Sequence, residues 1–132
     1  MTEISKELKI VLIINAIAAF FYGFMFLVIP EIYFDLSDEP YPNVHLQRLW
    51  GGTITLLGIF ALIAVKRGEW EGGKIMIEIA IGWLLLVVVI SLASLAYVKR
   101  SPTNIASTWS DIIVTLIFFL ITLYFYQKQK KG

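Results

Sequence analysis

The sequence predicts an all-α integral membrane protein, a four-helix transmembrane bundle, on three observations. Of its 132 residues, 58% are hydrophobic, and its mean hydropathy of +0.79 is well beyond that of soluble domains. Four apolar runs are each long enough to cross the hydrocarbon core of a bilayer as a helix. Short segments rich in Pro, Gly and charge separate these runs. We therefore expect a single transmembrane domain over residues 1–132.

The first predicted helix covers about residues 8–29. A short charged leader, MTEISKELK, runs into the apolar segment 10–29. This segment is too long for a signal peptide, and no small-x-small cleavage site follows it before Pro30, so we expect a retained transmembrane helix. Pro30 predicts its end, because proline cannot continue the backbone hydrogen-bond ladder.

Residues 30–45 are predicted to form an outer loop at the level of the lipid headgroups. The segment carries four acidic residues, three prolines and three aromatic residues. Aromatic side chains are enriched at membrane–water interfaces, so we expect Tyr33, Phe34 and Tyr41 to anchor this loop.

The second predicted helix, residues 46–65, is the stretch that organises the chain. It is an apolar run of about twenty residues, the length of a membrane span. It opens on Arg48 and contains three glycines. A soluble core helix has little reason for this arrangement, whereas a membrane helix that packs closely on its neighbours does.

Two further helices complete the predicted bundle. The charged turn KRGEWEGGK leads into the third helix, residues 74–98. Pro102 blocks its continuation, and Thr103 or Asn104 is placed to cap the fourth helix, residues 104–126. A basic tail, QKQKKG, follows.

Lysine and arginine are distributed unequally between the two sides that four crossings create. Eight lie on the side of the two termini and the 66–74 turn, against three on the opposite side. The positive-inside rule then predicts that both termini are cytoplasmic and that the 30–45 loop is outside. We expect a multi-pass protein, located in the cell membrane.

The composition excludes several chemistries. There is no cysteine, which rules out disulfides, iron–sulfur clusters and thiolate metal sites. The only histidine, His45, is expected to be a loop residue without metal-binding partners. The lysines lie at helix ends, so no nucleic-acid partner is expected. No nucleophile–base pair, metal set or phosphate loop is visible, so we expect no cofactor, and a non-enzymatic protein is favoured over an enzyme.

Polar residues inside the predicted spans are the candidate functional residues, because each is costly in lipid unless it is paired or hydrated. The alternating direction of the helices sorts them by depth into two layers. The outer layer contains Arg48 and Asp111, and the inner layer contains Asn15 and Glu78.

In the outer layer we expect an ion pair between Arg48 and Asp111 that faces the bundle interior. Thr55 shares the helix face of Arg48, and Thr115 shares that of Asp111. Both charged side chains lean toward the outer surface, which brings them within reach. In the alternative, Arg48 extends to the headgroups, and Asp111 stabilises a late helix start as the third residue after a Thr108 cap.

In the inner layer Glu78 has two interpretations. It is either a protonatable carboxylate in the bundle that exchanges a proton or holds a polar headgroup with Asn15, or a residue near the helix start that reaches water and pairs with Lys74. Asn15 is expected to make an interhelical hydrogen bond.

Small residues predict close packing between helices. They recur at or near a four-residue spacing, which lets two backbones approach. In the first two predicted helices they are Ala16, Ala19, Gly23, Gly51, Thr55 and Gly58.

The chain has four short spans, with Pro30 after the first, the sequence RLWG at Arg48 opening the second, and acids near the starts of the third and fourth. This pattern is similar to that of the DoxX-like group of small membrane proteins. The resemblance implies an accessory subunit of a quinone-linked or redox membrane system, with Arg48, Gly51, Glu78 and Asp111 as the residues of interest. The chain has no redox-active side chain, which argues against an independent oxidoreductase.

Two functions from different classes remain. The first is a non-enzymatic accessory subunit, or a bundle that binds lipid or quinone and holds a small amphipathic ligand in its polar network. The second is a small proton-coupled transporter that acts as an oligomer through Glu78 and Asp111, since four short helices seldom enclose a pathway alone. The expected partners are membrane lipid, a hydrophobic small molecule, and a second copy of the chain or a larger membrane complex.

Overall fold

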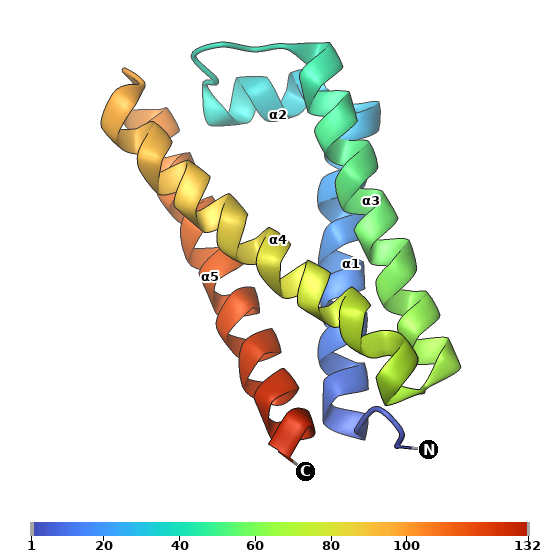
Figure 1. Ribbon diagram of the computed structural model, residues 1–132. Helices are drawn as coiled ribbons and strands as arrows, with labels where there is room; N and C mark the ends of the chain where they lie inside the picture. Colours follow the sequence, from blue (N-terminus) through green and yellow to red (C-terminus); the bar gives the residue numbers. More distant parts are fainter. Residues whose placement is uncertain (1, 132) are drawn as a thin grey trace.

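The computed structural model describes residues 2–131, over which it has five helices and no β-sheet. All but the short second helix are long and apolar enough to cross a membrane, which confirms the predicted all-helical fold class with four candidate spans. The helices are α1 (Lys6–Val28), α2 (Pro30–Ser37), α3 (Val44–Arg67), α4 (Trp70–Tyr97) and α5 (Pro102–Lys131), shown in Figure 1.

Local signals begin and end α1 and α3. The Ser5 hydroxyl caps α1 by accepting a hydrogen bond from the backbone N–H of Leu8 at 3.2 Å. The Asn43 side chain caps α3 in the same way, with the N–H of Leu46 at 3.0 Å. Gly68 ends α3 with a φ of 71°, a left-handed backbone conformation that residues other than glycine rarely adopt.

The last two helices begin earlier than predicted. α4 begins at Trp70, and its first turn includes the two glycines assigned to the preceding loop. α5 begins at Pro102, where the missing proline N–H is no loss because the first helical N–H groups have no intrahelical partner. Ser101, and not Thr103 or Asn104, acts as the cap, since its hydroxyl accepts from the N–H of Asn104 at 3.2 Å. α5 also continues to Lys131, beyond the predicted end at residue 126.

The predicted outer loop, residues 30–45, is wrong over its first half, which forms α2, and at its end, where Val44 and His45 belong to α3. Pro30 ends α1, as predicted, but it also occupies the first position of α2, which its fixed φ favours. Asp38 closes α2 with a φ of 51°. Phe34 is buried, so it packs in the bundle and does not anchor a surface loop, whereas Tyr41 is 73% exposed.

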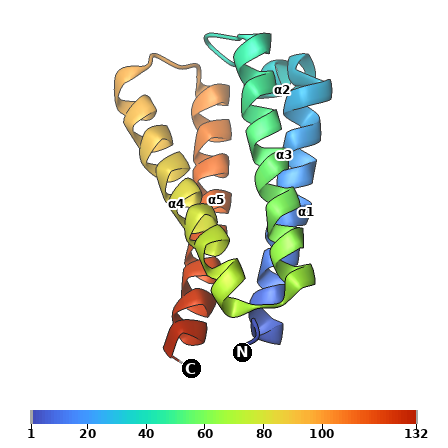
Figure 2. The same ribbon diagram turned by 45° about the vertical axis from the view of Figure 1, so that its right-hand side comes forward.

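The four long helices form two antiparallel pairs. α1 packs most extensively on α3, and α4 packs most extensively on α5. Figure 2 shows the two pairs diverging toward one end of the bundle, and Figure 1 shows α2 lying across that end. The two chain termini lie together at the opposite end.

The tightest part of the core lies at the end that carries the termini. The N-terminal segment is held there by backbone hydrogen bonds from Ile4 to Gly68 at 2.8 Å and from Trp70 to Thr2 at 3.0 Å. The side chain of Gln129 in α5 accepts from the backbone N–H of Ser5 at 2.7 Å. The buried cluster at this end consists of Ile4, Leu8, Leu12, Trp70, Ile77 and Tyr126.

The predicted small-residue contact between α1 and α3 is confirmed. A Cβ atom built on Gly51 would lie 2.8 Å from the Cβ of Phe26 and 2.9 Å from the backbone nitrogen of Leu27. A Cβ on Gly23 would overlap the Thr55 hydroxyl. The two helices therefore approach closely only because these positions lack side chains.

Gly51→Ala is expected to destabilise the protein by about 1–3 kcal/mol, because the added methyl group meets backbone that cannot move aside alone. Gly52→Ala is the matched control, since a Cβ at Gly52 meets nothing within 4 Å. Thermal unfolding in detergent measures both. Equal melting temperatures for the two variants would contradict the close contact.

Candidate functional site: an aromatic cavity with one carboxylate

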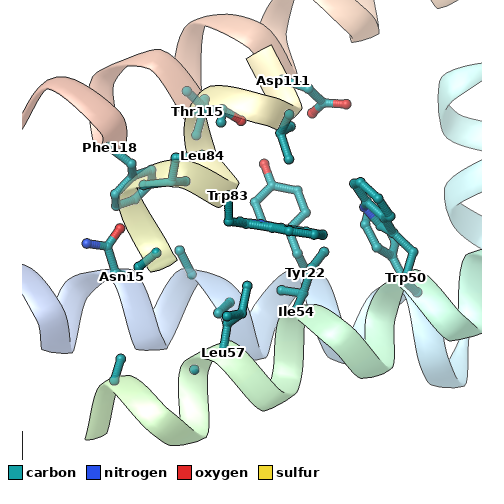
Figure 3. A pocket seen from close by; sticks show the side chains of 18 of the residues that line it. Asn15, Tyr22, Trp50, Ile54, Leu57, Trp83, Leu84, Asp111, Thr115 and Phe118 are labelled. Atoms are coloured by element: carbon teal, nitrogen blue, oxygen red, sulfur yellow. The ribbon is translucent and has the colours of Figure 1, made fainter. Parts of the chain in front are cut away.

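A cavity of about 260 Å³ lies between the α1–α3 pair and the α4–α5 pair. All five helices contribute to its wall, and most lining side chains are apolar. Figure 3 shows lining side chains from α1, α3, α4 and α5 that converge on this space. The aromatic members are Tyr22, Phe26, Tyr33, Trp50, Trp83 and Phe118, and the other polar members are Asn15, Ser91, Asp111 and Thr115.

Among residues 2–131, Asp111 is the only charged residue of this wall. It lies nine residues into α5, about 14 Å from Pro102 along the helix axis. Its Oδ2 atom accepts a hydrogen bond from the Tyr33 hydroxyl at 3.0 Å. In Figure 3 the hydroxyl of Tyr22 is directed toward the α5 side, where Asp111 lies. The hydrogen bond from Tyr33, a residue of α2, therefore holds the Asp111 carboxyl group at the cavity wall.

Tyr33 is positioned by packing as well as by this hydrogen bond. Its ring lies edge-on to that of Phe26 in α1, with 4.7 Å between the ring centroids. Burial raises the pKa of the Tyr33 phenol above its usual value, and the negative charge of Asp111 raises this pKa further. The hydroxyl thus keeps its proton and acts as a donor to Asp111.

Trp50 and Trp83 form the aromatic wall opposite α5. Trp50 comes from α3 and Trp83 from α4, and their ring centroids are 4.8 Å apart with the planes inclined at 41°. This contact closes the space between α3 and α4 beside the cavity. Large rigid rings of this kind present polarisable faces to a ligand.

The predicted ion pair between Arg48 and Asp111 is absent from the described residues. Arg48 is exposed, and its Nε donates to the backbone oxygen of Leu27 at 3.2 Å. Asp111 accepts from Tyr33 instead. The reason is that α2 packs against the bundle and places the Tyr33 hydroxyl beside Asp111, where the Arg48 side chain was expected.

The predicted inner layer is only half correct. Asn15 makes the expected interhelical hydrogen bond, from its Nδ2 to the Thr122 hydroxyl at 2.8 Å, and it lines the cavity. Glu78 is exposed on α4 and lies near Tyr126, outside the cavity. The structure therefore does not bring Glu78 and Asn15 together in one site, and the exposure of Glu78 fits the alternative in which its side chain reaches water.

The two threonines of the predicted network separate. Thr115 lines the cavity one turn beyond Asp111. Thr55 faces α1, and its hydroxyl donates to the backbone oxygen of Gly51 at 2.8 Å, so it belongs to the α1–α3 contact. Among the predicted site residues, the cavity collects Asn15, Asp111 and Thr115.

Sequence reasoning missed the aromatic residues of the site and a second polar cluster. Arg100, and not Arg48, is the arginine held inside by neutral partners, donating to Ser94 at 2.8 Å and to Asn104. Asn104 is 2% exposed and donates to the backbone oxygen of Ser37 at 2.7 Å. Arg100 lies in the short connection between α4 and α5, and its position in the sequence gave no signal of these hydrogen bonds.

Within residues 2–131, no group of three or more His, Cys, Asp or Glu side chains is placed to hold a metal ion. The chemistry available at the cavity is therefore that of one carboxyl group, phenol and amide hydrogen bonds, and aromatic faces.

Tyr33→Phe is expected to lower the free energy of unfolding by about 1–3 kcal/mol, because Asp111 loses its hydrogen-bond donor while the ring contact with Phe26 remains. Tyr41→Phe is the matched control, since Tyr41 is 73% exposed. In an Asp111→Ala background the same Tyr33→Phe change should cost much less. An equal cost in both backgrounds would show that the hydrogen bond does not stabilise the fold.

Comparisons of this chain with protein-family models, with curated proteins and with solved structures find no match.

Proposed function

We propose that this chain is a small multi-pass membrane protein whose bundle binds a small amphipathic molecule in the cavity between its two helix pairs. The four long helices have the length and composition of membrane spans. Their outward faces carry many exposed large apolar side chains, among them Ile17, Phe21 and Ile117, which is the surface expected of a protein solvated by lipid.

The cavity is the observation that carries this proposal. Protein interiors are close-packed, and voids larger than a water molecule are few. Here the side chains leave about 260 Å³ in one partly open space, many times the ~10–15 Å³ that one water needs. A mostly apolar wall with a few convergent polar groups is the usual form of a small-molecule site.

The finer parts of the proposal follow from the sequence. The excess of Lys and Arg beside the two termini favours a cytoplasmic location for both, and the structure has the termini at one end of the bundle. Three further points stay predictions. They are lipid or quinone as the bound molecule, an accessory role in a larger membrane complex, and the DoxX-like resemblance. A non-enzymatic role also stays a prediction, based on the absence of a recognisable nucleophile–base pair from the sequence.

The proton-coupled transporter has less support. That function requires Glu78 and Asp111 to share a pathway. Asp111 lines the cavity, whereas Glu78 is exposed on α4 outside it. We therefore favour binding over transport.

Native mass spectrometry of the protein extracted from its own membrane tests the proposal. The wild-type chain is expected to carry a bound small molecule. Ala80→Leu should lose it, because Ala80 lines the cavity and a larger side chain would occupy the space.

Ala93→Leu is the matched control, on the same helix but at an exposed position outside the cavity. It should retain the bound molecule. If both variants carry equal amounts of bound molecule, the molecule binds outside the cavity. If the wild-type chain carries no bound molecule, the proposed function is contradicted.

A further inference from the structure

We propose that the polar end of the bound molecule is a positive charge, so that the ligand is a hydrophobic amine or quaternary ammonium ion. This inference rests on the proposed function, because it names the chemical class that the same cavity would bind.

The first observation is a carboxyl group without a positive partner. Asp111 is the only charged member of the cavity wall, and among residues 2–131 no Lys or Arg forms an ion pair with it. Its one hydrogen bond, from Tyr33, occupies Oδ2. The other carboxyl oxygen has no hydrogen-bond donor from the described residues and is open to a ligand.

A carboxylate in this position is unfavourable without a counter-charge. Transfer of a lone charge into an apolar bundle is costly, and a buried carboxyl group either keeps its proton or has an opposite charge nearby. Arg48 does not supply it, since its side chain is exposed and hydrogen-bonded to Leu27. A cationic ligand would provide the charge that the protein lacks, and an anionic ligand would be repelled.

The second observation is independent of the carboxyl group. Six aromatic rings line the cavity, including the neighbouring pair Trp50 and Trp83. The face of an aromatic ring attracts a cation through the ring quadrupole, most strongly for tryptophan, and more so where water is excluded. Aromatic rings that line the same cavity as a carboxyl group are the components from which proteins build sites for quaternary ammonium groups, and they also offer apolar surface to the rest of the ligand.

The third observation is the cluster around Arg100. Its guanidinium donates to neutral oxygens of Ser94 and Asn104, outside the cavity wall. This positive charge is thus committed to its own neutral partners. It leaves the negative charge of Asp111 unbalanced at the cavity.

A pair of isosteric ligands tests the charge directly. Benzyltrimethylammonium carries a permanent positive charge, and neopentylbenzene has the same shape with carbon in place of nitrogen. Equilibrium titration of the full chain in detergent, with free concentrations corrected for uptake by protein-free micelles, gives both dissociation constants. The cation is expected to bind about tenfold or more tightly than the neutral isostere.

Asp111→Asn should reduce the affinity for the cation about tenfold while the affinity for neopentylbenzene changes less than about threefold. Unchanged binding of the neutral isostere also shows that this variant is folded. Asp35→Asn is the matched control, because Asp35 is an exposed acid of α2 outside the cavity. It should alter neither affinity.

The outcomes separate the inference from the proposed function. If the neutral isostere binds as tightly as the cation, or if Asp111→Asn keeps the full preference for the cation, the inference is wrong while ligand binding stands. If neither molecule binds, both the inference and the proposed function are contradicted. The comparison on the wild-type chain alone decides the charge, so it does not depend on the stability of any variant.

Discussion

The hydrogen bond from Tyr33 to Asp111 is the interaction on which the open end of this bundle depends. It joins α2 to α5, and the ring of Tyr33 packs on Phe26 of α1. Because α2 lies across the end where the two helix pairs diverge, this contact links both pairs, together with the hydrogen bond from Asn104 of α5 to Ser37 of α2. It also orients the only charged group of the cavity wall, so the architecture and the candidate site share one constraint.

The two ends of the bundle are built differently. At the end with the termini, large apolar side chains such as Leu8 and Ile77 are almost fully buried, and the N-terminal segment is tied to the α3–α4 turn. Toward the other end the two helix pairs diverge, and the side chains between them do not fill the space, so that the cavity remains.

Several polar side chains of the bundle hydrogen-bond to neutral partners. Arg100 donates to hydroxyl and amide oxygens, Asn15 to a hydroxyl, and Arg48 to a backbone carbonyl. Neutral partners satisfy hydrogen bonds without a second buried charge, which would carry its own desolvation cost. Asp111 is the exception, because its single neutral donor leaves a charge that nothing in the wall balances.

The sequence by itself determined the four spans, the termination of α1 before Pro30, the glycine contact between α1 and α3, and the hydrogen-bonding role of Asn15. These follow from hydropathy, proline chemistry and residue size, which act locally or along one helix face. Only the tertiary structure decided that α2 folds back into the bundle, that Tyr33 takes the place expected for Arg48, and that Trp50 meets Trp83. Those outcomes depend on how far two helix pairs diverge and on which side chains meet across the gap, and no periodicity in a single chain encodes that distance.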